Sequence, residues 1–184
     1  PSWAFSNHDA PRAVSRWAKE ADREHMCKLL MLLLVSLRGN AFIYQGEELA
    51  LPQGYVAFED LQDPEAITNR PHTLGRDGAR TPMPWAEGAD YGGFSSGGMW
   101  LKMDPNHESL AIDQQNTDPN SMLSFTRKLL SLRKTLPSLI VGDLELLDTP
   151  SEIIAFIRRT DRQETICAYN LSQNQISWHP GPAY

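Results

Sequence analysis

Two stretches decide the fold, PSWAFSNHD (residues 1–9) and AFIYQGEE (residues 41–48). Each begins with apolar residues, as a buried strand does, and ends in polar ones. Between them, residues 18–37 carry apolar side chains at three- and four-residue intervals, which predicts a helix. The order strand, polar loop, helix, strand, polar loop is typical of a βαβ unit. Barrels of parallel strands carry their chemistry at the carboxyl ends of the strands, and both polar clusters fall there.

The rest of the chain divides into an irregular stretch, a second helix and a run of short strands. Residues 49–117 are rich in Gly, Pro, Asp and Asn, and so long a loop region in a compact protein is usually functional or disordered. A helix is predicted over residues 118–136, started by Asp118 and Pro119 and ended by Pro137. Four segments then predict a small antiparallel β-domain, namely 144–147, 153–158, 165–170 and 175–178.

Composition and charge argue against several classes of function. The chain has 184 residues, 41% of them hydrophobic and 22% charged, the balance of a globular protein with a core. Its net charge of -6 argues against a nucleic-acid partner. The longest apolar run, Leu29–Val35, is too short to span a bilayer, which needs about 20 such residues. Cys27 and Cys167 are predicted to be small buried side chains, and no metal or other cofactor is expected.

Asn7, His8 and Asp9, with Arg12 close behind, bring an amide, an imidazole, a carboxylate and a guanidinium to one strand end. This cluster suits a polyhydroxylated ligand, because a carboxylate accepts hydrogen bonds from adjacent hydroxyls while imidazole and amide groups donate. A guanidinium can hold the carboxylate in place. An isolated triplet of this kind is nevertheless more often an ordinary polar loop.

Two further segments change that balance, FIYQGEE (residues 42–48) and GRDGARTPMPW (residues 75–85). In order and spacing, the three segments together resemble glycoside hydrolase family 13, in its α-glucosidase and oligo-1,6-glucosidase branch. By this resemblance, residues 5–9 are that family's fourth conserved region at the end of barrel strand seven. Residues 42–48 are similar to the strand-eight segment, and residues 75–85 to the loop that follows it.

The resemblance implies an α/β fold. Residues 1–136 would form the last two β/α units of a (β/α)8 TIM barrel, with a long loop region at 49–117. Residues 137–184 would form a small antiparallel β-sandwich domain, which need not be complete.

The resemblance also implies roles for single residues. Asp9 would be the third catalytic carboxylate, which holds two hydroxyls of the sugar and stabilises the transition state. His8 would bind the same glucosyl unit, and Arg76 would line the pocket that closes its non-reducing end. Asn7 and Arg12 join them as expected substrate-binding residues, although a structural role for Arg12 is open.

Other polar and aromatic residues of these segments are expected to be mainly structural. Glu47 and Glu48 would be acids at the barrel rim. Arg80 could be structural, and Trp85 is the best of the tryptophans for a platform under a sugar.

The implied parent enzyme is a retaining α-glucosidase, a glycosidase of carbohydrate metabolism that hydrolyses terminal α-linked glucose from di- and oligosaccharides. Retaining glycosidases need a nucleophile and a general acid roughly 5–5.5 Å apart. In this family both come from earlier strands of the barrel, and a complete barrel takes about 250 residues. The 184 residues alone are therefore expected to be inactive, and to self-associate or pair with the rest of the barrel.

Several alternatives stay open at this point. The parent could be a sucrose or trehalose isomerase or a transglycosidase, or a non-catalytic scaffold subunit of an amino-acid transporter. The chain could also be a folded fragment without a function of its own. Preference for α-1,4 or α-1,6 linkages, the identities of the nucleophile and acid, and the oligomeric state are left undecided. Free cysteines and the lack of a secretion signal favour a cytoplasmic location, with no membrane partner.

Overall fold

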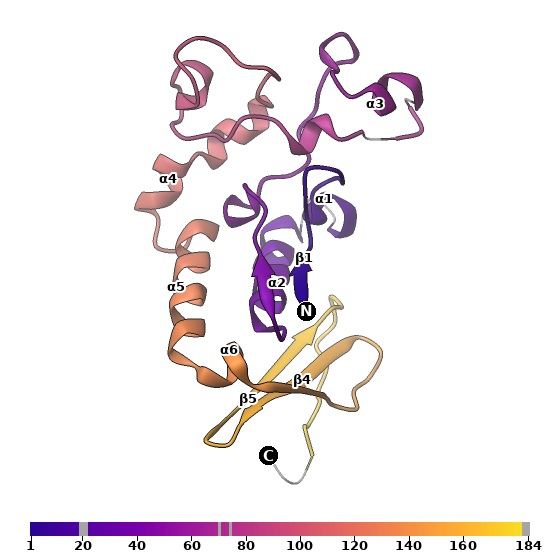
Figure 1. The fold of residues 1–184 in the computed structure, drawn as a ribbon, viewed down its shortest axis with the longest axis vertical. Helices are drawn as coiled ribbons and strands as arrows, with labels where there is room; N and C mark the ends of the chain where they lie inside the picture. Colours follow the sequence, from indigo (N-terminus) through magenta and orange to yellow (C-terminus); the bar gives the residue numbers. More distant parts are fainter. Residues whose placement is uncertain (19–21, 70, 74, 182–184) are drawn as a thin grey trace. The chain divides into compact units, whose positions relative to one another are not determined.

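A computed structural model describes residues 1–18, 22–69, 71–73 and 75–181. The chain forms two compact units, and each is built from segments that lie far apart in the sequence. We call the first the sheet unit; it contains Pro1–Trp3, Leu32–Ala41 and Leu129–Tyr184. The second, the loop unit, contains Ala4–Met31 and Phe42–Lys128. Figure 1 shows the elements in chain order, coloured from indigo to yellow.

The amino-terminal segment has the expected order of strand, helix and strand. It consists of β1 (Ser2–Ala4), α1 (Ala13–Trp17), α2 (Arg23–Ser36) and β2 (Asn40–Phe42), and β1 pairs with β2. The predicted helix over 18–37 is wrong at its start, because α2 begins at Arg23; residues 19–21 lie outside the described residues. The five-residue α1 is too short to give a periodic signal.

The second long helix, α5 (Met122–Thr135), begins later than its sequence suggests. Ser121 Oγ accepts a hydrogen bond from Ser124 N at 3.1 Å, so Ser121 and not Asp118 caps the helix. Asp118 Oδ1 accepts from Asn120 N at 2.8 Å and so forms a separate turn. Both residue types are good caps, and the pattern could not choose between them.

Pro137 ends α5 as predicted, and it also starts α6 (Pro137–Val141), where it occupies the first turn. Before α5, the short helix α4 (Ile112–Thr117) occupies the end of the stretch that was expected to be irregular.

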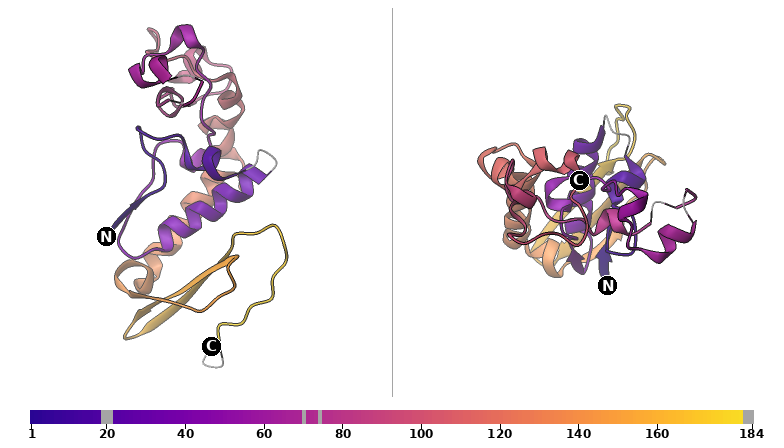
Figure 2. Two further views of the ribbon diagram at one scale, coloured as in Figure 1. Left: turned by 90° about the vertical axis from the view of Figure 1, so that its right-hand side faces the viewer. Right: turned by 90° about the horizontal axis from the view of Figure 1, so that it is seen from above.

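The carboxyl-terminal sheet is antiparallel and has the strand order β3-β4-β5. Its strands are β3 (Asp143–Leu146), β4 (Ile153–Thr160) and β5 (Gln163–Asn170), so three of the four predicted strands are confirmed. β4 and β5 lie side by side over their full lengths (Figures 1 and 2). The fourth prediction, 175–178, is wrong: this segment has no strand, and the side chain of Trp178 anchors it by donating to Asp148 O at 3.1 Å.

One face of this sheet carries the core of the sheet unit. Phe156, Cys167 and Tyr169 pack with Leu139 of α6 and with the carboxyl-terminal turn of α2. Arg158 is also fully buried on this face. Its guanidinium donates to Ser36 O at 2.6 Å and to Gly142 O at 2.9 Å, and burial lowers its pKa.

Residues 49–117 are ordered around two small apolar cores. One core contains Leu49, Leu51, Met83 and Leu123, and the other contains Val56, Leu61, Ala66 and Leu101. Short helical elements lie along this part of the chain: η2 (Glu47–Leu49), η3 (Phe58–Asp60), α3 (Pro64–Asn69), η4 (Asp77–Ala79), η5 (Asp90–Gly93) and η6 (Pro105–Leu110). The composition predicted the absence of long elements but not this packing. Within the described ranges, no helix has the length and apolar character needed to cross a bilayer.

Candidate active site

A cluster of charged side chains surrounds Asp9 in the loop unit. Asp9 Oδ1 accepts a hydrogen bond from Arg80 Nη2 at 2.9 Å, and Arg76 Nη1 lies 3.6 Å from the same oxygen. On the other side, His8 Nε2 lies 3.1 Å from Asp9 Oδ2. The Asp9 side chain is 56% exposed, so its carboxylate is held by basic groups and is still open to a ligand. Such a carboxylate can accept hydrogen bonds from sugar hydroxyls.

Backbone contacts fix the loop that carries Asp9. Asp9 N donates to Asn7 Oδ1 at 2.8 Å, which makes a local turn around His8. Arg80 Nε donates to His8 O at 2.8 Å. Arg80 therefore binds both the backbone and the carboxylate of this loop, and it places Asp9 relative to residues 76–80.

Arg76 is fixed by a second carboxylate. Asp63 Oδ1 accepts from Arg76 Nη2 at 2.5 Å and from Arg76 Nε at 3.0 Å, and Asp63 Oδ2 accepts from Arg76 N at 2.8 Å. Hydrogen bonds from Arg76 hold the pKa of Asp63 well below its usual value, and Asp63 in turn raises the pKa of Arg76. Arg76 therefore lies between a buried acid and the exposed Asp9.

The Arg76-Asp77-Gly78 turn depends on each of its residues. The buried Asp77 accepts hydrogen bonds at Oδ2 from Gln62 N at 2.7 Å and Asp63 N at 2.8 Å. A Cβ at Gly78 would lie 2.2 Å from Gly54 O, so only glycine permits this approach. The turn thus brings Arg76 beside Asp63 from a position 13 residues away along the chain.

Arg12 lies in the interior, away from the charges around Asp9. It is 1% exposed, and its guanidinium donates to Gln45 O at 2.6 Å and to Ala79 O at 3.4 Å. It also lies over the Tyr44 ring, 5.4 Å from the centroid. Burial lowers its pKa, although Tyr44 and nearby acids oppose this shift. These contacts give no support to a direct contact between Arg12 and a substrate.

Glu47 and Glu48 bind the backbone of the turn that follows β2. Glu47 accepts from Tyr44 N at 2.8 Å, and Glu48 accepts from Gly46 N at 2.8 Å. Burial raises the pKa of both carboxyl groups, and the charge of Arg12 opposes the rise. This arrangement agrees with the expectation that both are structural acids.

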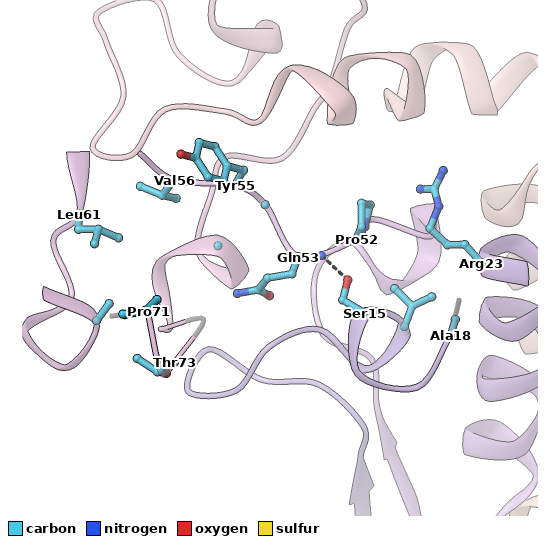
Figure 3. Close-up of a pocket in the computed structure, with 14 residues that line it drawn as sticks. Ser15, Ala18, Arg23, Pro52, Gln53, Tyr55, Val56, Leu61, Pro71 and Thr73 are labelled. Carbon is cyan, nitrogen blue, oxygen red and sulfur yellow. Dashed lines mark hydrogen bonds between the residues drawn. The ribbon is translucent and has the colours of Figure 1, made fainter. Parts of the chain in front are cut away.

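A cavity of about 460 Å³ opens between α1, residues 52–56 and described residues of the segment from Leu61 to Gly78 (Figure 3). Gln53 lines it, and the backbone N of Gln53 donates to Ser15 Oγ at 2.7 Å (Figure 3). Neither Asp9 nor Arg76 lines this cavity. Over the part of the chain that the structure describes, no group of three His, Cys, Asp or Glu side chains could hold a metal ion.

Residues 1–142 match the family model described as the alpha amylase catalytic domain. The chain belongs to this family, glycoside hydrolase family 13. The membership that the three motifs predicted is therefore confirmed.

Relatives and solved structures agree with this membership. The chain is 46% identical over 171 residues to a probable alpha-glucosidase of Rhizobium meliloti, covering 92% of this chain and 31% of the relative. It is 35% identical over 185 residues to an oligo-1,6-glucosidase of Halalkalibacterium halodurans, covering 90% of this chain and 33% of the relative. The chain thus spans about a third of the length of the curated relatives it matches.

Among solved structures, the alpha-glucosyl transfer enzyme XgtA matches with a TM-score of 0.89 and 44% identity, over 94% of this chain and 32% of XgtA. The trehalulose synthase MutB matches with a TM-score of 0.81 and 31% identity, over 92% of this chain and 34% of MutB.

Sequence reasoning missed two residues of this family member's candidate site. Asp63 precedes Pro64 and is typical of a helix cap, a role it does have, because its Oδ1 accepts from Glu65 N at 3.2 Å. Its contact with Arg76 depends on the fold of the intervening loop. Arg80 was recognised only as a possible structural residue, whereas it binds Asp9 directly.

Proposed function

We propose that this chain is part of a retaining α-glucosidase and that Asp9 is the third catalytic carboxylate of that enzyme. The observation that carries the proposal is the half-exposed Asp9 carboxylate, which is held by Arg80 and His8 and faced by Arg76. A non-catalytic scaffold subunit has no need for an accessible carboxylate in such a setting. The relatives named as a probable alpha-glucosidase and an oligo-1,6-glucosidase support the same choice.

In this role Asp9 acts on the glucosyl unit and not on the bond that breaks. Its carboxylate accepts hydrogen bonds from two neighbouring sugar hydroxyls, and its negative charge stabilises the oxocarbenium-like transition state. His8 donates to the same unit. Arg76, with a side chain 36% exposed, closes the non-reducing end of the sugar pocket.

Asn7 and Arg12 serve this site indirectly in our proposal. Asn7 holds the turn in which Asp9 lies. Arg12 ties the strand end at Gln45 to the turn at Ala79, so that two loops of the site keep their spacing. Both would be positioning residues.

The proposed fold of the parent is a (β/α)8 barrel to which residues 1–136 contribute the last two β/α units. Strands of such a barrel are buried on both faces. Here Trp3 is 40% exposed and Phe42 is 58% exposed, so both strands present apolar side chains that the rest of the barrel would cover. Residues 137–184 would belong to a β-sandwich domain, for which β3–β5 supply one sheet.

The 184 residues alone are expected to be inactive, because the nucleophile and the general acid do not lie in the motifs that match the family here. The test is a hybrid enzyme, in which this chain replaces the matched segment of the Rhizobium meliloti relative. The hybrid should release nitrophenol from p-nitrophenyl α-glucoside, and the isolated chain should not. A folded hybrid without activity, beside an active unmodified relative, would count against the proposal.

Transfer of the glucosyl group is the second candidate, favoured by the similarity to the alpha-glucosyl transfer enzyme XgtA. Hydrolysis and transfer share the same first step and differ in the acceptor. With maltose as substrate, a hydrolase yields glucose alone, whereas a transferase also yields longer or rearranged saccharides. Chromatography of the products of the hybrid separates the two.

A further inference from the structure

We propose that Asp63 is a positioning residue of this active site, which fixes the Arg76 guanidinium so that one amino group is directed at Asp9. The inference rests on the proposed function and deepens it, since it names the residue on which the pocket arginine depends.

Asp63 binds one edge of the Arg76 guanidinium, and the remaining amino group lies near Asp9. Asp63 takes hydrogen bonds from Nε at 3.0 Å, from Nη2 at 2.5 Å and from the backbone N at 2.8 Å. Because the guanidinium is planar and rigid, fixing Nε and Nη2 also fixes Nη1. Nη1 is the nitrogen that lies 3.6 Å from Asp9 Oδ1.

Asp63 can act as an anchor because it is itself buried and held by hydrogen bonds. Its side chain is 0% exposed. Asp63 Oδ1 accepts from Glu65 N in the first turn of α3, and Asp63 N donates to the buried Asp77 at 2.8 Å. A buried side chain held from several sides has little rotamer freedom, so the geometry that it imposes on Arg76 is well defined.

The loop around Asp63 is closed by a tight approach at Gly75. This residue has a φ of +63°, and an added Cβ would lie 2.4 Å from the Cβ of Ala66. The close approach places the start of α3 against residues 75–77, which include Arg76. Loop closure and ion pair therefore support one another.

Asp60 provides a contrast within the same loop. It pairs with Lys102 at 2.8 Å, but the Lys102 side chain is 75% exposed. Such a pair contributes little, because the lysine ammonium stays hydrated. Asp60→Asn is therefore the matched control, with the same chemical change three residues away.

The test is a double-mutant cycle in the hybrid enzyme, measured as kcat/KM for p-nitrophenyl α-glucoside. The four forms are the unmodified hybrid, Asp63→Asn, Arg76→Ala and the double variant. A group misplaced by about 1 Å can cost about 100-fold in rate. We expect Asp63→Asn to lower kcat/KM by at least about tenfold when Arg76 is present, and by less than about twofold when Arg76 is Ala.

A merely structural role would give a different pattern. Asp63→Asn would then lower activity by the same factor in both backgrounds, which would overturn the proposal, as would an unchanged kcat/KM in the single variant. Asp60→Asn should keep the activity of the hybrid.

If the unmodified hybrid is inactive, the proposed function fails, and the contact between Asp63 and Arg76 is tested separately. The same cycle is then run by urea unfolding of the 184-residue chain. Coupling between Asp63 and Arg76 in the free energy of unfolding supports the proposed fixing of Arg76 by Asp63. Additive effects, or a chain that shows no unfolding transition, overturn it.

Discussion

His107 should make the stability of the loop unit depend on pH. Its side chain is fully buried in η6, and Nε2 donates a hydrogen bond to Pro52 O at 3.1 Å. With the proton on Nε2, Nδ1 carries none, and Nδ1 has no partner among the described residues. Burial lowers the pKa of His107 to about 4, and the carboxylate of Asp104 only partly opposes this. The folded chain therefore keeps this imidazole neutral in mild acid.

The size of the effect follows from proton linkage. In the unfolded chain the ordinary pKa of 6.5 applies, so below that pH the unfolded chain binds a proton that the folded chain does not. The contribution of His107 to the free energy of unfolding is fully present above pH 6.5 and is lost as the pH falls toward about 4. Each unit of pKa difference is worth about 1.4 kcal/mol, so the total loss is about 3 kcal/mol. That is a large part of the roughly 5–15 kcal/mol of a typical domain.

The assay is urea unfolding of the chain between pH 7 and pH 4, followed by tryptophan fluorescence, for the unmodified chain and His107→Gln. Gln cannot titrate, so the variant should start less stable at pH 7 and lose less on acidification. The gap between the two chains should shrink by about 3 kcal/mol. His72→Gln, at an exposed imidazole, is the control for the substitution itself. Parallel curves for the unmodified chain and His107→Gln would refute the reasoning.

Two further substitutions test the packing of each unit. Arg158→Ala removes the buried guanidinium that donates to Ser36 O and Gly142 O. The variant should lower the free energy of unfolding by about 2–4 kcal/mol in urea titrations. A loss below about 1 kcal/mol would contradict this role of Arg158. Gly78→Ala places a Cβ 2.2 Å from Gly54 O. This variant should lower the free energy of unfolding by about 1–3 kcal/mol and reduce the activity of the hybrid. Unchanged stability and activity would show that the turn can open.

The sequence predicted those parts of the molecule that depend on local pattern. Apolar periodicity located α2 and α5, and alternation located β3, β4 and β5. Alternation alone did not suffice at residues 175–178, because a strand also needs a partner with free backbone groups. Short elements such as α1 gave no periodic signal.

The candidate site was predictable where its residues lie in contiguous motifs. Asp9, His8 and Arg76 were all expected together, and the structure brings them together. Asp63 was missed because its role depends on a loop that returns 13 residues later. Arg12 was expected to bind the substrate, with a structural role left open, whereas its contacts are with carbonyl groups far away in the sequence.

The most direct test of the central claim is the loss of p-nitrophenyl α-glucoside hydrolysis on Asp9→Asn in the hybrid enzyme. Asp161→Asn, at the exposed turn between β4 and β5, is the matched control and should keep full activity. Loss of a group that stabilises transition-state charge costs about 10²–10³-fold in kcat, and we expect at least that for Asp9→Asn. A hybrid whose Asp9→Asn variant hydrolyses the glucoside as fast as the unmodified form would contradict the assignment of Asp9 as the third catalytic carboxylate.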